Sequence, residues 1–134
     1  MKTAPQDLWE AAKSVLKQAY APYSHFQVAA AIRAKNGDIF VGCNVENAAF
    51  PLTACAEANA IGALVTRGNK VITEVLILVA GDKICPPCGA CRQRLLEFSA
   101  KSLPIHLCTL KNSYAHFTLD QLLPCAFDSK NLEN

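Results

Sequence analysis

Two short runs bring together cysteines and a glutamate at a spacing that suits metal chemistry. Residues 53–57 read Thr-Ala-Cys-Ala-Glu, and residues 86–93 read Pro-Pro-Cys-Gly-Ala-Cys-Arg-Gln. Their cysteines are Cys55, Cys88 and Cys91. Three thiolates can hold a tetrahedral zinc ion, Zn2+, and leave its fourth position for a water molecule whose pKa falls to about 7. A carboxylate beside that water can move its protons, so we predict one zinc per chain with Glu57 as the catalytic residue.

The Cys-x-x-Cys spacing fits such an ion. Cys88 and Cys91 stand at i and i+3 in the expected first turn of a helix, where Cβ atoms are about 5 to 6 Å apart. Sulfurs held about 2.3 Å from a tetrahedral zinc lie roughly 3.8 Å from each other, which this turn permits. A helix N-terminus favours negative charge and lowers thiol pKa values. Cys55 is expected at the start of another helix, so two helix starts would face one ion.

Cys85 is a rival ligand, because Cys85, Cys88 and Cys91 repeat every third residue. However, Pro86 and Pro87 favour an extended path that separates the Cα atoms of Cys85 and Cys88 by about 9 Å. This reach makes a shared zinc awkward, so we favour Cys55, Cys88 and Cys91 as the ligands.

Two other interpretations of the Cys-x-x-Cys leave Glu57 without a role. A structural zinc site needs a fourth ligand, and a redox dithiol needs only two cysteines. The available fourth ligands lie in strand or loop stretches without ligand spacing: His25, His106 and His116. Residues at i and i+2 on a helix do not share a face, so Glu57 is poorly placed to join Cys55 as a ligand. The remaining cysteines are interpreted as small buried hydrophobic residues: Cys43, Cys108 and Cys125.

Composition limits the class of protein. The chain has 134 residues, of which 51% are hydrophobic, and this predicts a single domain over residues 1–134. A net charge of +2 without a basic run disfavours binding to a nucleic acid polymer. No segment reaches the roughly 18 apolar residues of a membrane span, and charged residues within 1–20 argue against a signal peptide. We therefore expect a cytoplasmic protein with reduced cysteines and no membrane partner.

The residue patterns predict an alternation of helices and strands that would position these groups. We expect helices at 6–19 (ended by Pro22), 54–65 and 88–99, strands at 26–34, 39–45, 75–80, 104–110 and 114–118, a helical turn at 119–123, and a plain polar terminus at 128–134. Asn36-Gly37 predicts a tight hairpin turn between the first two strands. The 75–80 strand is apolar on both faces, as in a sheet covered on both sides. The order predicts an α/β fold, a three-layer α/β/α sandwich with a mixed five-stranded sheet.

Five segments together resemble the small homotetrameric three-cysteine cytidine deaminases. They are Tyr23-Ser24-His25-Phe26, residues 42–48 (Gly-Cys-Asn-Val-Glu-Asn-Ala), residues 53–57, residues 87–93, and Leu122-Leu123-Pro124 with Phe127. The resemblance implies zinc-dependent hydrolysis of cytidine and 2′-deoxycytidine to the uridines and ammonia, in pyrimidine salvage. Attack would occur at C4 of the base, with Glu57 carrying protons to N3 and to the departing amine.

The same resemblance implies substrate contacts. Asn44 and Glu46 would hydrogen-bond the ribose, and their i, i+2 spacing at a strand end puts them on one face. Phe26 would pack against the pyrimidine, although by pattern it is equally a core residue. Backbone groups around Ala56 would read the base. Phe127 would come from a neighbouring subunit, which makes the homotetramer part of a shared site.

One position departs from the family pattern. Many relatives continue Cys-Ala-Glu with arginine, whereas this chain has Ala58. Zinc with three thiolates carries a net charge of −1, which tends to raise the pKa of the bound water. Our hypothesis is that two helix N-termini, with Arg92 and with Gln93 bonded to a sulfur, compensate.

Three alternatives remain beside a free-nucleoside deaminase. A blasticidin S deaminase shares the zinc pattern and also lacks that arginine, while Phe26, Asn44 and Glu46 favour cytidine. A polynucleotide deaminase should have a basic channel and usually a histidine in place of Cys55. A structural zinc module would leave Glu57 unused.

Overall fold

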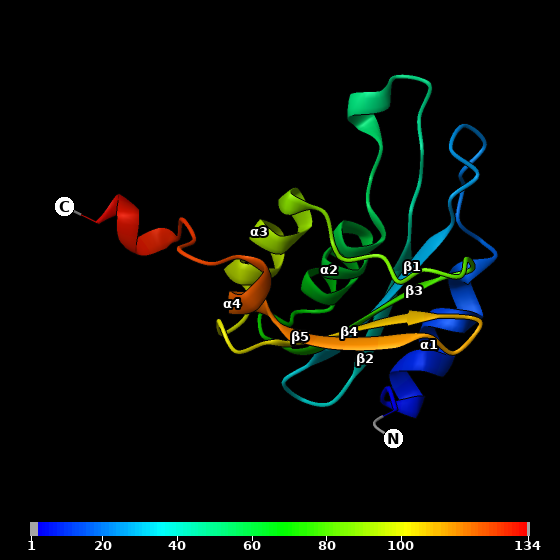
Figure 1. Ribbon diagram of the computed structural model, residues 1–134. Coiled ribbons are helices and arrows are strands. Elements are labelled where there is room, and N and C mark those ends of the chain that lie inside the picture. Colours follow the sequence, from blue (N-terminus) through cyan, green and yellow to red (C-terminus); the bar gives the residue numbers. More distant parts are fainter. Residues whose placement is uncertain (1–2, 134) are drawn as a thin grey trace.

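A computed structural model describes residues 3–133 and shows helices on both faces of one sheet (Figure 1). The helices are α1 (Gln6–Leu16), η1 (Phe50–Leu52), α2 (Ala56–Thr66), α3 (Gly89–Glu97), α4 (Leu119–Leu122) and η2 (Ser129–Leu132). The strands are β1 (Val28–Ala34), β2 (Ile39–Cys43), β3 (Ile72–Val79), β4 (Pro104–Thr109) and β5 (Tyr114–Thr118). Within residues 3–133, no helix combines the length and apolar content needed to cross a membrane.

The sheet has the strand order β2-β1-β3-β4-β5. Only the β3–β4 pair is parallel, and the other three pairs are antiparallel. Helix α1 covers one face, and α2 and α3 cover the other (Figure 1). The predicted three-layer sandwich with a mixed five-stranded sheet is therefore confirmed.

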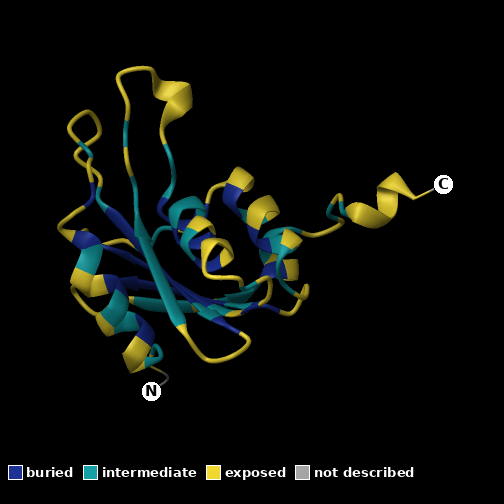
Figure 2. Cartoon of the chain, turned by 180° about the vertical axis from the view of Figure 1, so that it is seen from behind, coloured by how far each residue is buried: buried dark blue, intermediate teal, exposed yellow. Residues whose placement is uncertain are grey.

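Strand β3 is buried on both faces, as its composition predicted. Val75, Ile77 and Val79 belong to the apolar cluster under α2 and α3. Leu76 and Leu78 belong to the cluster under α1. Figure 2 shows this buried centre together with an exposed loop around η1 and an exposed C-terminal segment.

The boundaries move where distant parts of the chain pair with each other. Helix α1 ends at Leu16, well before Pro22, because Tyr20 is drawn into a bridge with Val45. The Tyr20 amide donates to Asn44 O at 2.9 Å, and the Glu46 amide donates to Tyr20 O at 2.9 Å. The prediction that Pro22 ends the first helix was wrong, since long-range backbone pairing claims residue 20 first.

Two turns also differ in detail from the predictions. In the β1–β2 hairpin only Gly37 has a positive φ, +96°, and the Ala34 amide bonds Asp38 O, so the loop has three residues. Such a loop uses glycine in its left-handed position. The 128–134 terminus is not plain coil: Asp128 caps η2 by accepting from the Lys130 amide at 2.9 Å. Residue 134 lies outside the described part.

Gly42 sets how closely α2 approaches the sheet. A Cβ at this position would lie 2.5 Å from Ala56 O and 2.5 Å from Ala60 N, both backbone atoms of α2. Gly42→Ala is therefore expected to destabilise the fold by about 1–3 kcal/mol through overpacking. The urea midpoint measures this loss.

Gly62 supplies the control, because it lies in the same helix with nothing within 4 Å of an added Cβ. Gly62→Ala is expected to leave stability unchanged or raise it by up to about 1 kcal/mol, since alanine favours helix. Equal losses in the two variants would contradict the close approach at Gly42.

A polar network crosses the α1 face of the sheet. Arg33 bonds Asp7 Oδ1 through Nη2 at 2.8 Å and Glu74 Oε1 through Nε at 3.1 Å. Glu74 Oε2 lies 2.8 Å from His106 Nε2, and His106 Nδ1 lies 2.8 Å from Tyr114 Oη. With a carboxylate at Nε2, the neutral ring carries its proton there and accepts from the Tyr114 hydroxyl. The network joins α1 to four residues on four strands.

His106 should make stability depend on pH. Its residue is 7% exposed, and burial lowers the pKa of its imidazole below 6.5, although Glu74 opposes this and His116 reinforces it. Because the unfolded chain then binds more protons, stability is expected to fall as pH drops below about 6.5. His106→Asn should lose less melting temperature between pH 7 and pH 5 than the native protein, and exposed His25→Asn should follow the native slope. Parallel slopes for His106→Asn and the native protein would remove His106 from this role.

Candidate active site

The three cysteines predicted to bind metal lie together at the starts of α2 and α3. Cys55 is the N-cap of α2, Cys88 is the N-cap of α3, and Cys91 is buried one turn inside α3. The Sγ atoms of Cys55 and Cys88 are 3.9 Å apart, and all three sulfurs lie within 4.8 Å of one another. A tetrahedral zinc needs sulfurs roughly 3.8 Å apart, so the donor set and its spacing fit this ion.

Backbone contacts hold the start of α2 in place. Val45 and Ala54 form a bridge in which each amide donates to the other carbonyl at 2.9 Å. Asn59 Nδ2 donates to Cys43 O at 2.8 Å, which ties the first turns of α2 to the end of β2. The close approach at Gly42 completes this docking. Cys55 is therefore carried on a helix start that is fixed against the sheet.

Arg92 holds the start of α3. Its Nε donates to Pro87 O at 2.8 Å, and its Nη1 donates to Leu122 O at 2.6 Å. Gln93 Nε2 donates to Phe127 O at 2.8 Å. Our hypothesis that Arg92 and Gln93 compensate the thiolates was wrong, because these hydrogen bonds go to carbonyls that need donors.

Arg94 contacts a thiol of the cluster. Its Nη1 lies 3.7 Å from Cys91 Sγ, one helical turn away on α3. The sequence carries the signal, since Cys91 and Arg94 have the i, i+3 spacing of neighbours on one helix face. Sequence reasoning missed it by considering only the next two residues after Cys91.

Glu57 lies in the first turn of α2 and is 5% exposed. Among residues 3–133, the ligand cluster contains the three cysteines and not this carboxylate, as predicted. Burial raises the pKa of Glu57 above 4.5, while its own backbone amide, the Cys91 thiol and the charge of Arg94 oppose that rise. A buried carboxyl group beside a metal cluster is suited to accept and release protons.

The thiols differ in how readily they ionise. Burial raises the pKa values of Cys55 and Cys91, and nearby negative groups add to the effect. Burial also acts on Cys88, but hydrogen bonds from the Cys91 amide and from the other two thiols outweigh it and lower its pKa. Cys88 is therefore the first to ionise. A bound dication changes this order, because a coordinating thiol is deprotonated outright.

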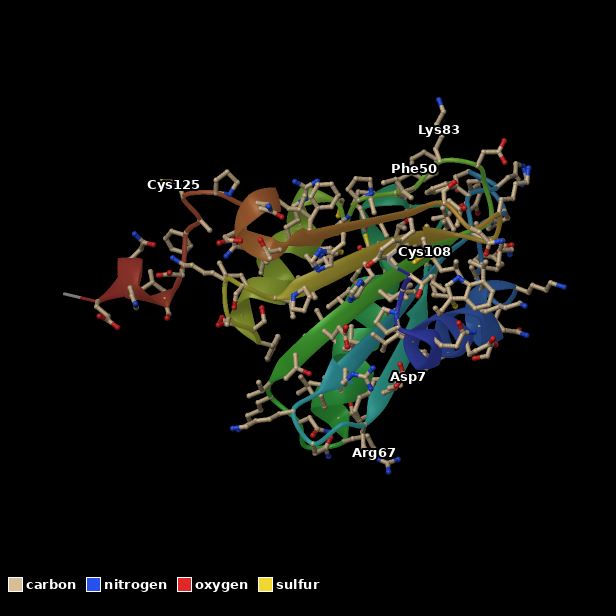
Figure 3. All side chains as sticks on the ribbon, turned by 60° about the horizontal axis from the view of Figure 1, so that its bottom comes forward. Asp7, Phe50, Arg67, Lys83, Cys108 and Cys125 are labelled. Carbon is tan, nitrogen blue, oxygen red and sulfur yellow. The ribbon has the colours of Figure 1, made fainter. Side chains whose placement is uncertain are left out.

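Cys85 lies outside the cluster, as the geometry of Pro86-Pro87 predicted. Its thiol donates to Pro86 O at 3.5 Å, and the pKa of Cys85 is raised by burial and by the charges of Glu57 and Cys88. All seven cysteines are free thiols. Cys108 is buried as expected and Cys43 is half-buried, but Cys125 is exposed on the C-terminal segment (Figure 3). The buried interpretation of Cys125 was wrong, because that segment leaves the core.

None of the three histidines, all within the described residues, joins the thiol cluster. His106 is engaged by Glu74 and Tyr114 on the opposite face of the sheet. His25 is exposed in a turn with a φ of 58°. A closed structural zinc site completed by histidine therefore has no support from this arrangement.

The predicted substrate residues lie around the entrance to α2 and on the C-terminal segment. Asn44 accepts from the Val28 amide at 2.9 Å and donates to Phe26 O at 2.8 Å. Glu46 accepts from the amides of residues 23 and 24 and from the Ser24 hydroxyl, and this hydroxyl contact most lowers the pKa of Glu46. Both side chains thus turn toward one segment, residues 23–28, and both shape it. Phe26 is 45% exposed.

The other two predicted contacts differ sharply in exposure. Ala56 is buried as the first residue of α2. Phe127 is 58% exposed and lies on the segment that extends away from the sheet (Figure 1). The described chain therefore does not bring Phe127 against the cluster by burial.

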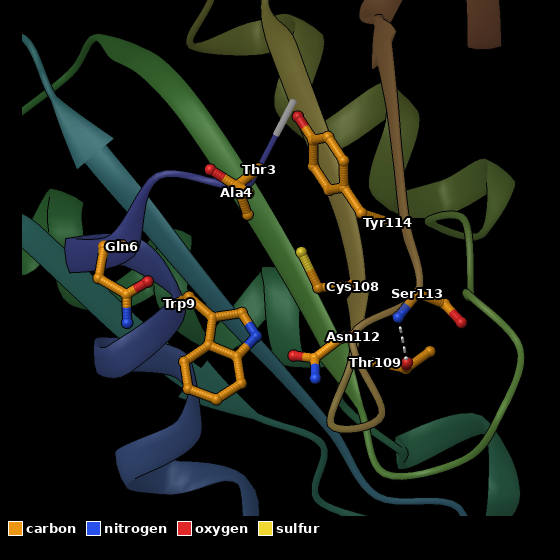
Figure 4. Close-up of a pocket in the computed structure, with 9 residues that line it drawn as sticks. All are labelled: Thr3, Ala4, Gln6, Trp9, Cys108, Thr109, Asn112, Ser113 and Tyr114. Atoms are coloured by element: carbon orange, nitrogen blue, oxygen red, sulfur yellow. Dashed lines mark hydrogen bonds between the residues drawn. The ribbon is translucent and has the colours of Figure 1, made fainter. Parts of the chain in front are cut away.

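The two largest cavities are not lined by the thiols. One, of about 590 Å³, lies on the α1 side and is lined by Trp9, Cys108 and Tyr114 among others (Figure 4). The other, of about 510 Å³, lies between α3 and the C-terminal segment. The reactive groups instead gather where two helices begin.

Comparisons with known proteins agree with this geometry. The sequence profile described as "Cytidine and deoxycytidylate deaminase zinc-binding region" matches residues 2–107. The chain is 40% identical over 120 residues to cytidine deaminase of Sporosarcina psychrophila, covering 90% of this chain and 88% of that protein. It is 42% identical over 114 residues to cytidine deaminase of Mycoplasma genitalium, covering 84% and 87%.

A solved structure shows the same fold. The crystal structure of cytidine deaminase from Burkholderia pseudomallei superposes with a TM-score of 0.87 at 35% sequence identity, covering 93% of this chain and 100% of that one. The profile, the relatives and the three-cysteine cluster together show that the chain belongs to the cytidine and deoxycytidylate deaminase family and is a zinc-binding enzyme of the hydrolase class.

Proposed function

We propose that this enzyme hydrolyses cytidine and 2′-deoxycytidine to uridine and 2′-deoxyuridine, releasing ammonia, as a step of pyrimidine salvage. The observation that supports it most directly is a buried carboxyl group, Glu57, beside three clustered sulfurs that it does not join. Relatives at 40% and 42% identity are named cytidine deaminases. A structural zinc module would not need this buried acid.

In the proposed mechanism, Cys55, Cys88 and Cys91 hold one zinc ion, which activates a water molecule for attack on carbon. Glu57 accepts a proton from the attacking water and delivers it to N3 as the C4–O bond forms. Glu57 then carries the second proton to the exocyclic nitrogen, the C4–N bond breaks, and ammonia leaves. Burial of Glu57 supports both roles, because it brings the pKa of the carboxyl group closer to neutrality.

Residues 23–28 form the proposed nucleoside platform. Asn44 and Glu46 would accept hydrogen bonds from the ribose with the acceptor capacity that their backbone contacts leave free. Phe26, held in place by Asn44 Nδ2 at its carbonyl, would pack on the pyrimidine. Backbone groups at Ala56, in the first turn of α2, would read the base. These contacts favour an ordinary nucleoside over blasticidin S.

The proposed assembly is a homotetramer in which Phe127 enters a neighbouring subunit's site. Large apolar side chains support it by their exposure on the η1 loop and the C-terminal segment: Phe50, Leu52, Phe127 and Leu132. Mixing the separately inactive variants Glu57→Gln and Phe127→Ala should restore part of the activity if sites are shared, because some mixed sites contain both native residues. No recovery after subunit exchange would contradict sharing.

The proposal includes a cytoplasmic location and a single domain over residues 1–134. A site built from three free thiols requires a reducing compartment, and all seven cysteines are unpaired. The two apolar clusters, on opposite faces of one sheet, draw on elements from α1 to α4 and support one cooperative unit.

Ammonia release tests the substrate class. Zinc-loaded protein should deaminate cytidine and 2′-deoxycytidine, with much weaker activity on blasticidin S and none on a cytosine-containing single-stranded oligonucleotide. Preferential turnover of blasticidin S would select the antibiotic deaminase, and turnover of the oligonucleotide would select the polynucleotide deaminase.

A further inference from the structure

Arg94 reaches from the surface of α3 to a sulfur of the metal cluster. Cys91 is fully buried, whereas Arg94 is exposed, and yet its Nη1 lies 3.7 Å from Cys91 Sγ. The two residues are one helical turn apart, so the helix itself holds the guanidinium over this sulfur. A guanidinium is always charged and donates hydrogen bonds in a fixed geometry.

The cluster has a surplus of negative charge that needs a cation. Three thiolates around a zinc dication leave a net charge of −1, and ionised Glu57 adds a second negative charge nearby. The N-termini of α2 and α3 supply only partial positive charge. Arg92 is engaged by the carbonyls of Pro87 and Leu122, which leaves Arg94 as the cation in contact with a cluster sulfur among the described residues.

We propose that Arg94 is a positioning residue of the zinc site, whose guanidinium bonds the Cys91 thiolate and offsets the negative charge of the loaded cluster. The inference deepens the proposed function and rests on it. Arg94 touches neither the nucleoside nor the reacting atoms, and it acts through Cys91.

The geometry predicts a second position from which the same charge could act. Ala58 follows Cys55 by three residues on α2, as Arg94 follows Cys91 by three residues on α3. An arginine at position 58 would therefore lie one turn from the Cys55 sulfur. Ala58 is half-buried, so a long side chain can extend from it toward solvent along the helix.

Zinc affinity, measured without nucleoside by competition with a chromophoric chelator at one pH, tests the proposal. R94Q is expected to bind zinc about tenfold more weakly than the native protein, the usual loss when a partner of a ligand is removed. R94K, which keeps the charge, should lose less. R67Q, the same change of charge at the far end of α2 (Figure 3), should bind zinc like the native protein.

Relocating the charge separates electrostatics from packing. The double variant R94Q/A58R should recover most of the lost affinity. The gap between R94Q and native protein should also shrink when salt rises from about 0.1 M to about 1 M, because the Debye length falls from about 10 Å to about 3 Å. A merely structural role of Arg94 would show neither effect.

Equal zinc affinity of R94Q and the native protein would overturn the proposal. A loss in R94Q that persists at high salt and in both R94K and R94Q/A58R would overturn it too. The proposed function fails separately: a protein with the expected R94Q shift that does not deaminate cytidine contradicts only the substrate. Turnover with an unchanged R94Q affinity contradicts only the role of Arg94.

Discussion

Replacing Glu57 by glutamine is expected to lower kcat for cytidine by about 100- to 10,000-fold, the usual contribution of a general acid–base group. Glutamine keeps the size and the buried position of the side chain but can neither accept nor release a proton at neutral pH. Because the carboxyl group lies outside the thiol cluster, bound zinc should remain at one ion per chain. Steady-state kinetics and metal analysis of the same preparation measure both quantities.

The Glu57→Gln variant should also be at least as stable as the native protein. A carboxylate that is 5% exposed carries a cost of desolvation that neutral glutamine avoids. Glu97→Gln, the same chemical change at the exposed end of α3, is the matched control and should leave kcat unchanged. Full activity of Glu57→Gln with zinc bound would remove Glu57 from the chemistry, and loss of zinc would make it a ligand.

Local pattern was sufficient to predict the element order and the position of the thiols. Strand β5 has the predicted bounds, and Cys55 and Cys88 each cap the helix that was expected to carry them. These features depend on residues close in sequence: apolar periodicity, turn residues and the stiffness of Pro86-Pro87. The boundaries that moved depend on distant pairing, as Tyr20 shows by joining Val45.

The parts of the site that sequence could not resolve are those where one side chain has several possible partners. Asn44 and Glu46 were expected to face the ribose, and the fold shows that they also bond the backbone of residues 23–28. Arg92 was expected near sulfur, but two carbonyls claim it. Which partner is chosen depends on how α3 packs beside α4, and this is a property of the tertiary structure.

A pair of cysteine-to-serine substitutions tests the ligand set. Cys91→Ser is expected to abolish binding of stoichiometric zinc and all turnover, because a serine hydroxyl does not replace a thiolate at a site that needs three. At a free zinc concentration about 100-fold above Kd, binding stabilises a native protein by about 2.7 kcal/mol. Added zinc should therefore raise the Tm of the native protein and fail to raise that of Cys91→Ser.

Cys85→Ser makes the same change six residues earlier, on a half-buried cysteine outside the cluster. It should keep one zinc per chain, the zinc-dependent rise in Tm, and activity close to native. Because Cys91 is fully buried, its serine variant also places a hydroxyl where a thiol was, at a cost of about 1–3 kcal/mol if that hydroxyl finds no partner. The comparison of each variant with and without zinc cancels this packing cost. Zinc loss in Cys85→Ser with retention in Cys91→Ser would exchange the two cysteines, since the ion would then be held along residues 85–88 and not by the first turn of α3.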